Sequence, residues 1–112
     1  MKIEFYKHSI EKSDIENVVS VLNSLFLTTG EVVGEFEEKF SQYLGCRKTV
    51  GLTSCTAALH LALLACGVGP GDEVITTPMT FTASANSILY TGAKPVFVDV
   101  ESETGNINAG LI

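Results

Sequence analysis

The sequence contains no long apolar run, no cluster of Lys or Arg and no leader-like start. A membrane-spanning helix needs about 20 consecutive apolar residues. A secretory signal needs an apolar segment, whereas charges recur throughout residues 1–14. We therefore expect a cytoplasmic protein that is one soluble domain or part of one. The net charge of −6, without a basic patch, argues against nucleic acid and anionic membranes as partners.

Cysteine is also scarce, with only Cys46, Cys55 and Cys66 in the chain. Their number is odd, and their spacing fits neither a CxxC metal pair nor a disulfide framework, so we expect reduced thiols. Acidic residues gather at 31–38 and 99–103, but no His or Cys joins them. These runs are typical of solvated surface, and no metal site is predicted.

Two amphipathic helices are predicted in the first 45 residues. The letters SDIE at Ser13 to Glu16 form a capping-box pattern, and apolar residues at helical spacing follow, which predicts a helix over 14–26. A turn at 27–30 precedes a second helix over 31–44, with apolar residues on one face and mostly Glu on the other. Gly45 is expected to end it.

The pattern changes after residue 45. We expect strands at 49–52, 73–77 and 95–100, and helices at 56–66 and 80–90 that end at Gly67 and Gly92. This alternation predicts βαβ crossovers, a parallel sheet and an α/β fold with helices on both faces. We therefore divide the chain into a helical segment, 1–45, and the start of an α/β domain, 46–112.

The carboxyl-terminal residues suggest that another element begins there. Asn106 and Asn108 stand where a helix N-cap is expected, yet only a few residues follow before Ile112. Three parallel strands would also leave apolar edges and an uncovered face. We expect the chain to be the first part of a longer protein.

The junction between the first expected strand and its helix favours an anion. Its letters are TVGLTSCTAALHLALL, from Thr49 to Leu64. A helix N-terminus offers unpaired backbone N–H groups and a partial positive charge. An anion can approach this turn closely because its side chains are small: Ser54, Cys55, Thr56 and Ala57. Two of them, Ser54 and Thr56, carry hydroxyl groups. On this pattern alone, a simple N-cap role for Ser or Thr is the favoured interpretation.

Two other patterns have less support. Cys55 and His60 could form a nucleophile–base pair, but five residues on a helix turn the side chains about 140° apart, so we expect a thiol in a buried turn and a packed histidine. The glycine-rich letters GVGPGD at Gly67 to Asp72 follow a helix and open a strand, which is the reverse of a dinucleotide-binding motif. They are typical of a helix stop and a turn.

A family resemblance covers nearly the whole chain. It is carried by LTTGEVVGEFEEKFSQYLG, by TSCTAALHLALLACGVGPGDEVITTPMTFTASANSILYTGAKPVFVDV and by ETGNIN. Together these resemble the amino-terminal part of the DegT/DnrJ/EryC1/StrS family of pyridoxal-phosphate-dependent nucleotide-sugar aminotransferases. The resemblance implies the beginning of a fold type I large domain, with a parallel βαβαβ unit preceded by two helices.

The same resemblance implies roles for single residues. Thr56 and Ala57 would contact the cofactor phosphate with Cys55 beside them, and Phe81 would stack on the pyridine ring, a contact of about 0.5–1.5 kcal/mol. Thr28, Thr29 and Gly30 match a loop near the substrate's diphosphate, although an ordinary turn between helices explains them too. Asn86 and Asp99 are as consistent with packing or solvation as with ligand contact.

The implied activity is transfer of an amino group from an amino acid such as glutamate to a nucleotide-linked keto-sugar, by a homodimer. No catalytic residue is assigned, because the family's Schiff-base lysine and pyridinium-binding Asp have no match among the 112 residues. The six lysines fall outside the family's lysine contexts. The alternative is a non-catalytic remnant or phosphate-binding module without turnover.

Overall fold

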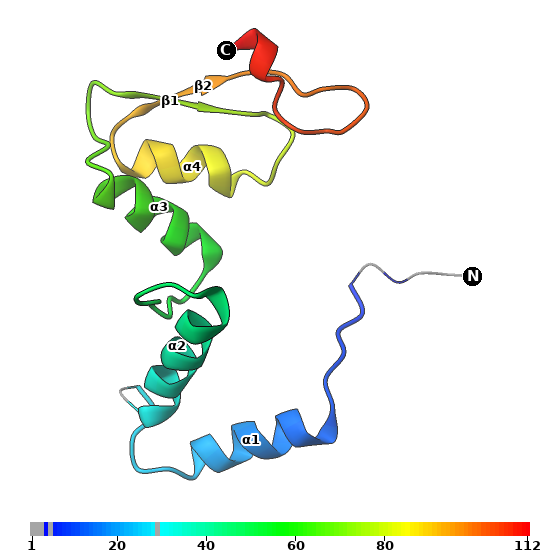
Figure 1. The fold of residues 1–112 in the computed structure, drawn as a ribbon, viewed down its shortest axis with the longest axis vertical. Helices are drawn as coiled ribbons and strands as arrows, with labels where there is room; N and C mark the ends of the chain where they lie inside the picture. Colours follow the sequence, from blue (N-terminus) through cyan, green and yellow to red (C-terminus); the bar gives the residue numbers. More distant parts are fainter. Residues whose placement is uncertain (1–3, 5, 29) are drawn as a thin grey trace. The chain divides into compact units, whose positions relative to one another are not determined.

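The structure is a computed structural model that describes residues 4, 6–28 and 30–112 (Figure 1). The chain forms two compact units, Met1–Gly51 and Leu52–Ile112, here called unit 1 and unit 2. Unit 1 contains the helices α1 and α2, and unit 2 contains α3, β1, α4, β2 and the short 3₁₀ helix η1. Within the described part of the chain, no helix is long and apolar enough to span a bilayer.

Helix α1 covers Lys12–Leu22 and is shorter than the predicted 14–26. Its N-cap is Glu11 rather than Ser13, and the Glu11 N–H donates to Asp14 Oδ2 at 2.9 Å. The helix ends at Asn23, whose Nδ2 donates to the Val19 carbonyl at 2.9 Å. Such a side-chain bond to the preceding turn favours a helix end, and Leu25 and Phe26 therefore lie outside the helix.

Helix α2 covers Glu31–Leu44 as predicted, and its C-cap is Gly45 in the left-handed conformation, with φ 66°. Phe40 stacks between Phe36, at 5.6 Å between ring centroids, and Tyr43, at 6.4 Å. All three rings stay exposed, as do the other apolar residues of this face. The amphipathic pattern therefore formed the helix without a packing partner on that face within unit 1.

The predicted strand at 49–52 is wrong, because this segment is irregular. The Thr49 hydroxyl donates to the Glu37 carbonyl at 2.6 Å, and the Gly51 N–H donates to Glu37 Oε1 at 2.7 Å. A strand forms only where a neighbouring strand accepts and donates its backbone hydrogen bonds. Here a residue of α2 supplies the partners instead.

Unit 2 contains the parallel sheet. Helix α3 (Cys55–Ala65) leads to β1 (Glu73–Thr76), and α4 (Ala83–Tyr90) leads to β2 (Lys94–Phe97). The two strands pair in parallel with Glu73 opposite Lys94. This confirms the α/β class, although the described residues form two strands rather than three.

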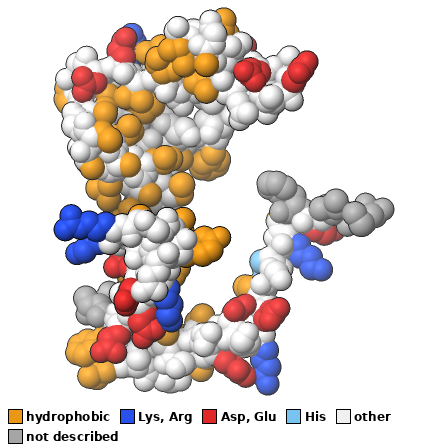
Figure 2. Space-filling view, in the orientation of Figure 1, with side chains coloured by type: hydrophobic (Ala, Val, Ile, Leu, Met, Phe, Trp, Pro, Cys, Tyr) orange, Lys and Arg blue, Asp and Glu red, His pale blue; other side chains and the backbone are white. Residues whose placement is uncertain are grey.

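Helix α4 packs on both strands, and α3 packs on α4 (Figure 1). The expectation of helices on both faces is thus not met within the described residues. Ile75 and Phe97 on the strands remain exposed. Figure 2 shows hydrophobic side chains gathered over the surface of unit 2.

The small core of unit 2 lies where α4 turns into β2. Ile88, Ala93 and Val98 are buried, together with Ser87 and Thr91. The Thr91 hydroxyl donates to the Ile88 carbonyl at 2.7 Å and accepts from the Ala93 N–H at 3.2 Å. The buried turn thereby meets its own hydrogen-bonding needs.

Glycines end both helices of unit 2 as predicted. Gly67 and Gly92 have φ of 81° and 83°. A Cβ at Gly92 would also lie 2.9 Å from Pro70 Cγ, so that turn has no room for a side chain. The segment from Gly67 to Asp72 is a helix stop and a turn, closed by a 2.8 Å bond from the Gly69 N–H to Asp72 Oδ2.

The carboxyl-terminal residues begin another helical turn, as predicted from Asn108. Its Oδ1 accepts from the Gly110 N–H at 3.0 Å and caps η1 (Ala109–Leu111). Val100 and Ile107 form an antiparallel bridge just before it. Asn108 therefore acts as an N-cap, whereas Asn106 accepts a bond from the Glu101 N–H through its carbonyl.

Candidate functional site

The amino-terminal end of α3 is the first part of the candidate site. Ser54 is the N-cap, and its Oγ accepts from the Ala57 N–H at 3.1 Å. The first bond inside the helix runs from the Ala58 N–H to the Ser54 carbonyl, also at 3.1 Å. The N–H groups of Cys55 and Thr56 thus have no acceptor within the helix. They are available to an anion at the positive end of the helix dipole.

The side chains at this end are small and partly accessible. Thr56 and Ala57 are half-buried, whereas Cys55 is exposed and carries a free thiol. The expectation of a buried turn around Cys55 is therefore wrong, because this turn lies at the surface of unit 2. For Ala57 to donate its N–H to a phosphate, the Ser54 hydroxyl must first release it. The roles inferred for these three residues remain predictions.

Phe81 lies in a second feature of unit 2, a hollow of about 210 Å³ just before α4. Its ring is 78% exposed. The hollow is lined by uncharged residues: Thr77, Pro78, Thr80, Phe81, Thr82, Ala85, Asn86 and Phe97. An exposed ring beside hydroxyl and amide groups is suited to hold a flat polar ring by stacking.

Phe81 was expected inside a helix over 80–90, but α4 begins only at Ala83. The Met79 N–H donates to Thr77 Oγ1 at 3.2 Å, and the hydroxyl groups of Thr80 and Ser84 lie 3.0 Å apart. Threonine and serine hydroxyls in such turns compete with the helix for backbone groups. The delayed start leaves Phe81 outside the packed helix.

Figure 1 shows α3 and α4 next to each other within unit 2, and the first residue of each helix is at its right-hand end in this view. The two helices are in contact, and the rings of His60 and Tyr90 meet edge to face with centroids 5.6 Å apart. This contact confirms His60 as a packed residue. Within the described residues, no hydrogen bond joins it to the Cys55 thiol.

Among the residues that the structure describes, no lysine lines the hollow beside Phe81. Three of the chain's lysines form ion pairs on other surfaces: Lys12 with Glu16 at 3.5 Å, Lys39 with Glu35 at 3.4 Å and Lys94 with Glu73 at 2.7 Å. The hydrogen bond and the negative charge of Glu73 raise the pKa of Lys94 above its ordinary value. Lys94 is therefore protonated and paired with Glu73 on the sheet. A nucleophilic lysine needs a neutral amine, so Lys94 is not suited to that role.

The predicted substrate loop lies in unit 1, between α1 and α2. Thr28 is exposed, Thr29 lies outside the described residues, and Gly30 is the half-buried N-cap of α2. A Cβ at Gly30 would lie 2.7 Å from the Phe26 carbonyl oxygen, so the turn itself requires a glycine. Substrate contact by this loop remains a prediction.

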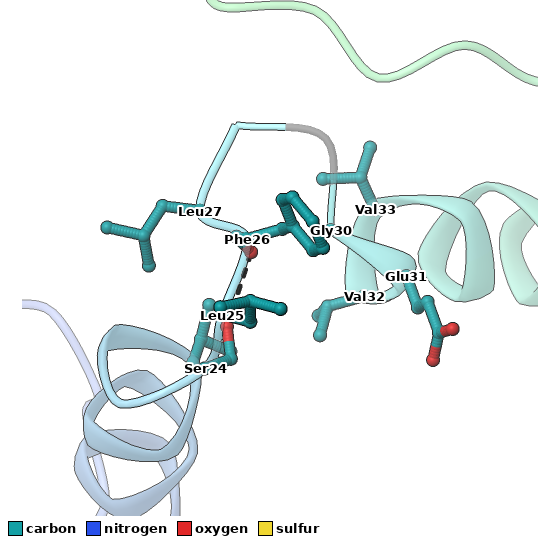
Figure 3. Close-up of a pocket in the computed structure, with 9 residues that line it drawn as sticks. Ser24, Leu25, Phe26, Leu27, Gly30, Glu31, Val32 and Val33 are labelled. Carbon is teal, nitrogen blue, oxygen red and sulfur yellow. Dashed lines mark hydrogen bonds between the residues drawn. The ribbon is translucent and has the colours of Figure 1, made fainter.

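Gly30 also borders a mostly apolar hollow of about 490 Å³. In Figure 3, Leu25 and Phe26 point toward the first turn of α2, whereas Leu27 points away. The Ser24 hydroxyl donates to the Phe26 carbonyl at 3.2 Å and closes the turn. Because its lining is mostly Leu, Val and Phe, this hollow suits apolar groups better than a diphosphate.

Sequence reasoning assigned no role to Glu37, Thr77 or Thr80, and the structure gives each of them one. Thr77 and Thr80 line the hollow beside Phe81 and shape its turn. The half-buried Glu37 holds the segment that leads toward α3. Clustered threonines next to Pro78 were a usable signal of a structured turn, whereas one Glu among several on α2 was not.

Comparison with known proteins places the chain in a family. The model of the DegT/DnrJ/EryC1/StrS aminotransferase family matches residues 8–112. The spore coat polysaccharide biosynthesis protein SpsC of Bacillus subtilis is 50% identical over 99 residues, which are 88% of this chain and 25% of that protein. The UDP-4-amino-4-deoxy-L-arabinose–oxoglutarate aminotransferase of Shewanella sediminis is 45% identical over 93% of this chain and 27% of its own length.

A solved structure agrees with this assignment. The putative sugar aminotransferase Spr1654 of Streptococcus pneumoniae, in its PLP form, superposes with a TM-score of 0.91 at 43% identity, over 99% of this chain and 28% of that one. The same protein has also been solved in a PMP form. This chain thus spans about a quarter of the length of these relatives. The chain belongs to the DegT/DnrJ/EryC1/StrS aminotransferase family.

Proposed function

We propose that these 112 residues form the first part of a pyridoxal-phosphate-dependent enzyme that transfers an amino group from an amino acid to a nucleotide-linked keto-sugar. The observation that carries the proposal concerns the amino-terminal end of α3. There, the N–H groups of Cys55 and Thr56 have no acceptor in the helix. The proposal has further support from a relative solved with this cofactor, whose structure superposes on 99% of the chain.

The residues at this end fit a phosphate group. Two outward N–H groups, the Thr56 hydroxyl and the helix dipole offer donors and positive potential without a basic side chain. The Ser54 hydroxyl is adaptable, because it can keep the Ala57 N–H or rotate to donate to the anion. The small side chains at Cys55 and Ala57 allow the phosphate to approach the backbone closely.

The hollow beside Phe81 fits the ring of the same cofactor. The Phe81 ring offers an exposed face, and the hydroxyl groups of Thr77 and Thr80 and the Asn86 amide offer hydrogen bonds at its edge. When bound, pyridoxal phosphate supplies the electron sink that transamination requires. The role of this chain is to hold and orient the cofactor.

The substrates and the assembly are also part of the proposal. The name of the Shewanella relative includes oxoglutarate and a UDP-linked amino sugar, which supports glutamate as donor and a nucleotide-linked sugar as acceptor. We further propose a cytoplasmic homodimer, in which Thr28, Thr29 and Gly30 contact the substrate's diphosphate. Transamination needs a Schiff-base lysine, and we propose that it lies outside these 112 residues.

The test uses the complete enzyme, meaning the protein that contains this chain together with the remaining length that its relatives have. Thr56→Val removes one hydroxyl donor and keeps the side-chain shape. Hydrogen bonds to charged groups are worth about 1.5–3 kcal/mol, so we expect cofactor affinity to fall roughly tenfold or more. Absorbance titration with pyridoxal phosphate measures this change.

The control is Thr104→Val, which removes an exposed hydroxyl that bonds Glu101 in a loop after β2. Unchanged affinity in this variant and a loss in Thr56→Val support the proposal. Equal affinity in both variants removes Thr56 from the site. A complete enzyme that binds the cofactor but transfers no amino group from any amino acid supports the non-catalytic alternative.

A further inference from the structure

Glu37 contacts the connection between α2 and α3 in two ways. Its carboxylate Oε1 accepts from the Gly51 N–H at 2.7 Å, and its backbone carbonyl accepts from the Thr49 hydroxyl at 2.6 Å. Both bonds join residues more than ten positions apart in the sequence, and Glu37 and Thr49 are half-buried. All three residues belong to unit 1, so the contact lies within one compact unit.

The other acidic residues on the same helix behave differently. Glu35 pairs with Lys39, and Glu38 accepts from Gln42 at 3.3 Å, each one turn along the exposed surface. Glu37 alone among these three reaches the connecting segment. A backbone N–H bonded to a carboxylate is a charge-assisted bond, which is stronger than a bond between neutral groups. A charge-assisted bond therefore holds Gly51, in a segment that has no regular secondary structure.

Gly51 lies only three residues before Ser54, the N-cap of α3. Residues between 46 and 54 belong to no strand, and the two bonds to Glu37 are among the contacts that order their backbone. Ordering a residue's backbone costs conformational entropy. A turn that is already ordered binds its ligand without meeting this cost again.

We propose that Glu37 is a positioning residue for the phosphate-binding turn: it fixes Thr49 and Gly51, and so orders the chain that enters Ser54, Cys55 and Thr56. This inference rests on the proposed function, because it assumes that the cofactor phosphate binds at the start of α3. Glu37 does not touch the ligand. It acts through the backbone that leads to it.

The experiment compares variants of the complete enzyme by two measurements, the dissociation constant for pyridoxal phosphate and the melting temperature without cofactor. Glu37→Met removes the acceptor and keeps the length of the side chain, and we expect roughly tenfold weaker cofactor binding. Glu37→Gln keeps an oxygen acceptor and should restore most of the affinity. Thr49→Val removes the second bond and should give a smaller loss in the same direction.

Two controls separate this effect from general destabilisation. Glu35→Met has the same chemistry on an exposed surface and should leave cofactor affinity unchanged. Glu38→Met removes the exposed acceptor of Gln42 one turn along the same helix and should likewise leave cofactor affinity unchanged. A circular-dichroism band of the bound cofactor in each variant reports whether the ligand is held in the same orientation.

The outcomes distinguish the two proposals. If the unmodified complete enzyme does not bind pyridoxal phosphate, the proposed function fails and this inference fails with it. If it binds, but Glu37→Met and Thr49→Val lower only the melting temperature, Glu37 is merely structural and the positioning role is overturned. If Glu37→Met does not fold, the affinities of Glu37→Gln and Thr49→Val decide, since the proposal requires a near-normal value for the first and a weakened value for the second.

Discussion

Units 1 and 2 both follow amphipathic patterns, yet they differ in what they bury. In unit 1, α1 and α2 contain no buried residue. In unit 2, α4 buries Ile88 and Ser87, and the residues just before and just after β2 bury Thr91, Ala93 and Val98. The comparison teaches that helical periodicity predicts a helix, whereas burial requires a second element that packs on its apolar face.

The largest expected effect tests this difference directly. Ile88 is 2% exposed, and Ile88→Ala should lower the free energy of unfolding of unit 2 by about 2–4 kcal/mol, because it leaves a cavity. Val19→Ala on α1, where the side chain is 49% exposed, should change stability by less than about 0.5 kcal/mol. Urea unfolding followed by circular dichroism measures both. If both substitutions lowered the free energy of unfolding equally, the contrast between a buried side chain in unit 2 and an exposed one in unit 1 would be wrong.

A second prediction concerns the glycine turns of unit 2. Gly92→Ala should cost about 2–3 kcal/mol, because alanine has to adopt φ 83° and its Cβ would lie 2.9 Å from Pro70 Cγ. Gly67→Ala meets only the conformational cost, since nothing lies within 4 Å, and should lose about 1 kcal/mol. Thermal unfolding gives both values. A larger loss at Gly67 than at Gly92 would contradict the close contact with Pro70.

A third prediction contrasts the two kinds of helix start. Ser54→Ala removes the hydroxyl that caps α3 and should cost about 1 kcal/mol. The N-cap of α2 is Gly30, which has no side chain to cap the helix, so Gly30→Ser tests the effect of adding a capping hydroxyl. That variant should destabilise the turn despite the added hydroxyl, because its Cβ would meet the Phe26 carbonyl at 2.7 Å. Amide hydrogen exchange in the first turn of each helix measures the outcome.

The smallest effect is expected at the exposed pair of Lys94 and Glu73 across the sheet. The pKa of Lys94 is raised by the bond to Glu73, so any stability from this pair is fully present below the unfolded lysine pKa of about 10.4 and is lost as pH rises through the raised value. Glu73→Gln should lower the pKa of Lys94, which NMR titration measures, with little change in stability at pH 7. A pKa that stays the same would remove Glu73 as its cause.

The parts of the fold that follow local rules were predicted from the sequence. Both ends of α2 matched, because the amphipathic pattern and Gly45 lie within the helix or next to it. The ends of α1 depended on Glu11 and Asn23, whose side-chain bonds the apolar pattern does not show. The strand expected at 49–52 could not be decided locally, since strands need partners that are distant in sequence.

The candidate site likewise has one part that could be predicted from local sequence and other parts that could not. The anion site that we propose at the amino-terminal end of α3 follows from small residues at a helix start, which is a local pattern. The exposed position of Phe81 depends on hydroxyl bonds around Thr77 and Thr80 that delay α4. The contact between Glu37 and Gly51 joins positions fourteen residues apart, so no short motif reveals it.

The sheet of unit 2 also affects how the isolated chain behaves in solution. Among the described residues, β1 and β2 have only each other as partners, so each presents an outer edge of unpaired N–H and C=O groups. Ile75 and Phe97 lie exposed on these strands. An open edge with apolar side chains is a template on which another strand can grow. Strand addition from a second chain, which grows with protein concentration, is therefore a route by which these 112 residues would associate.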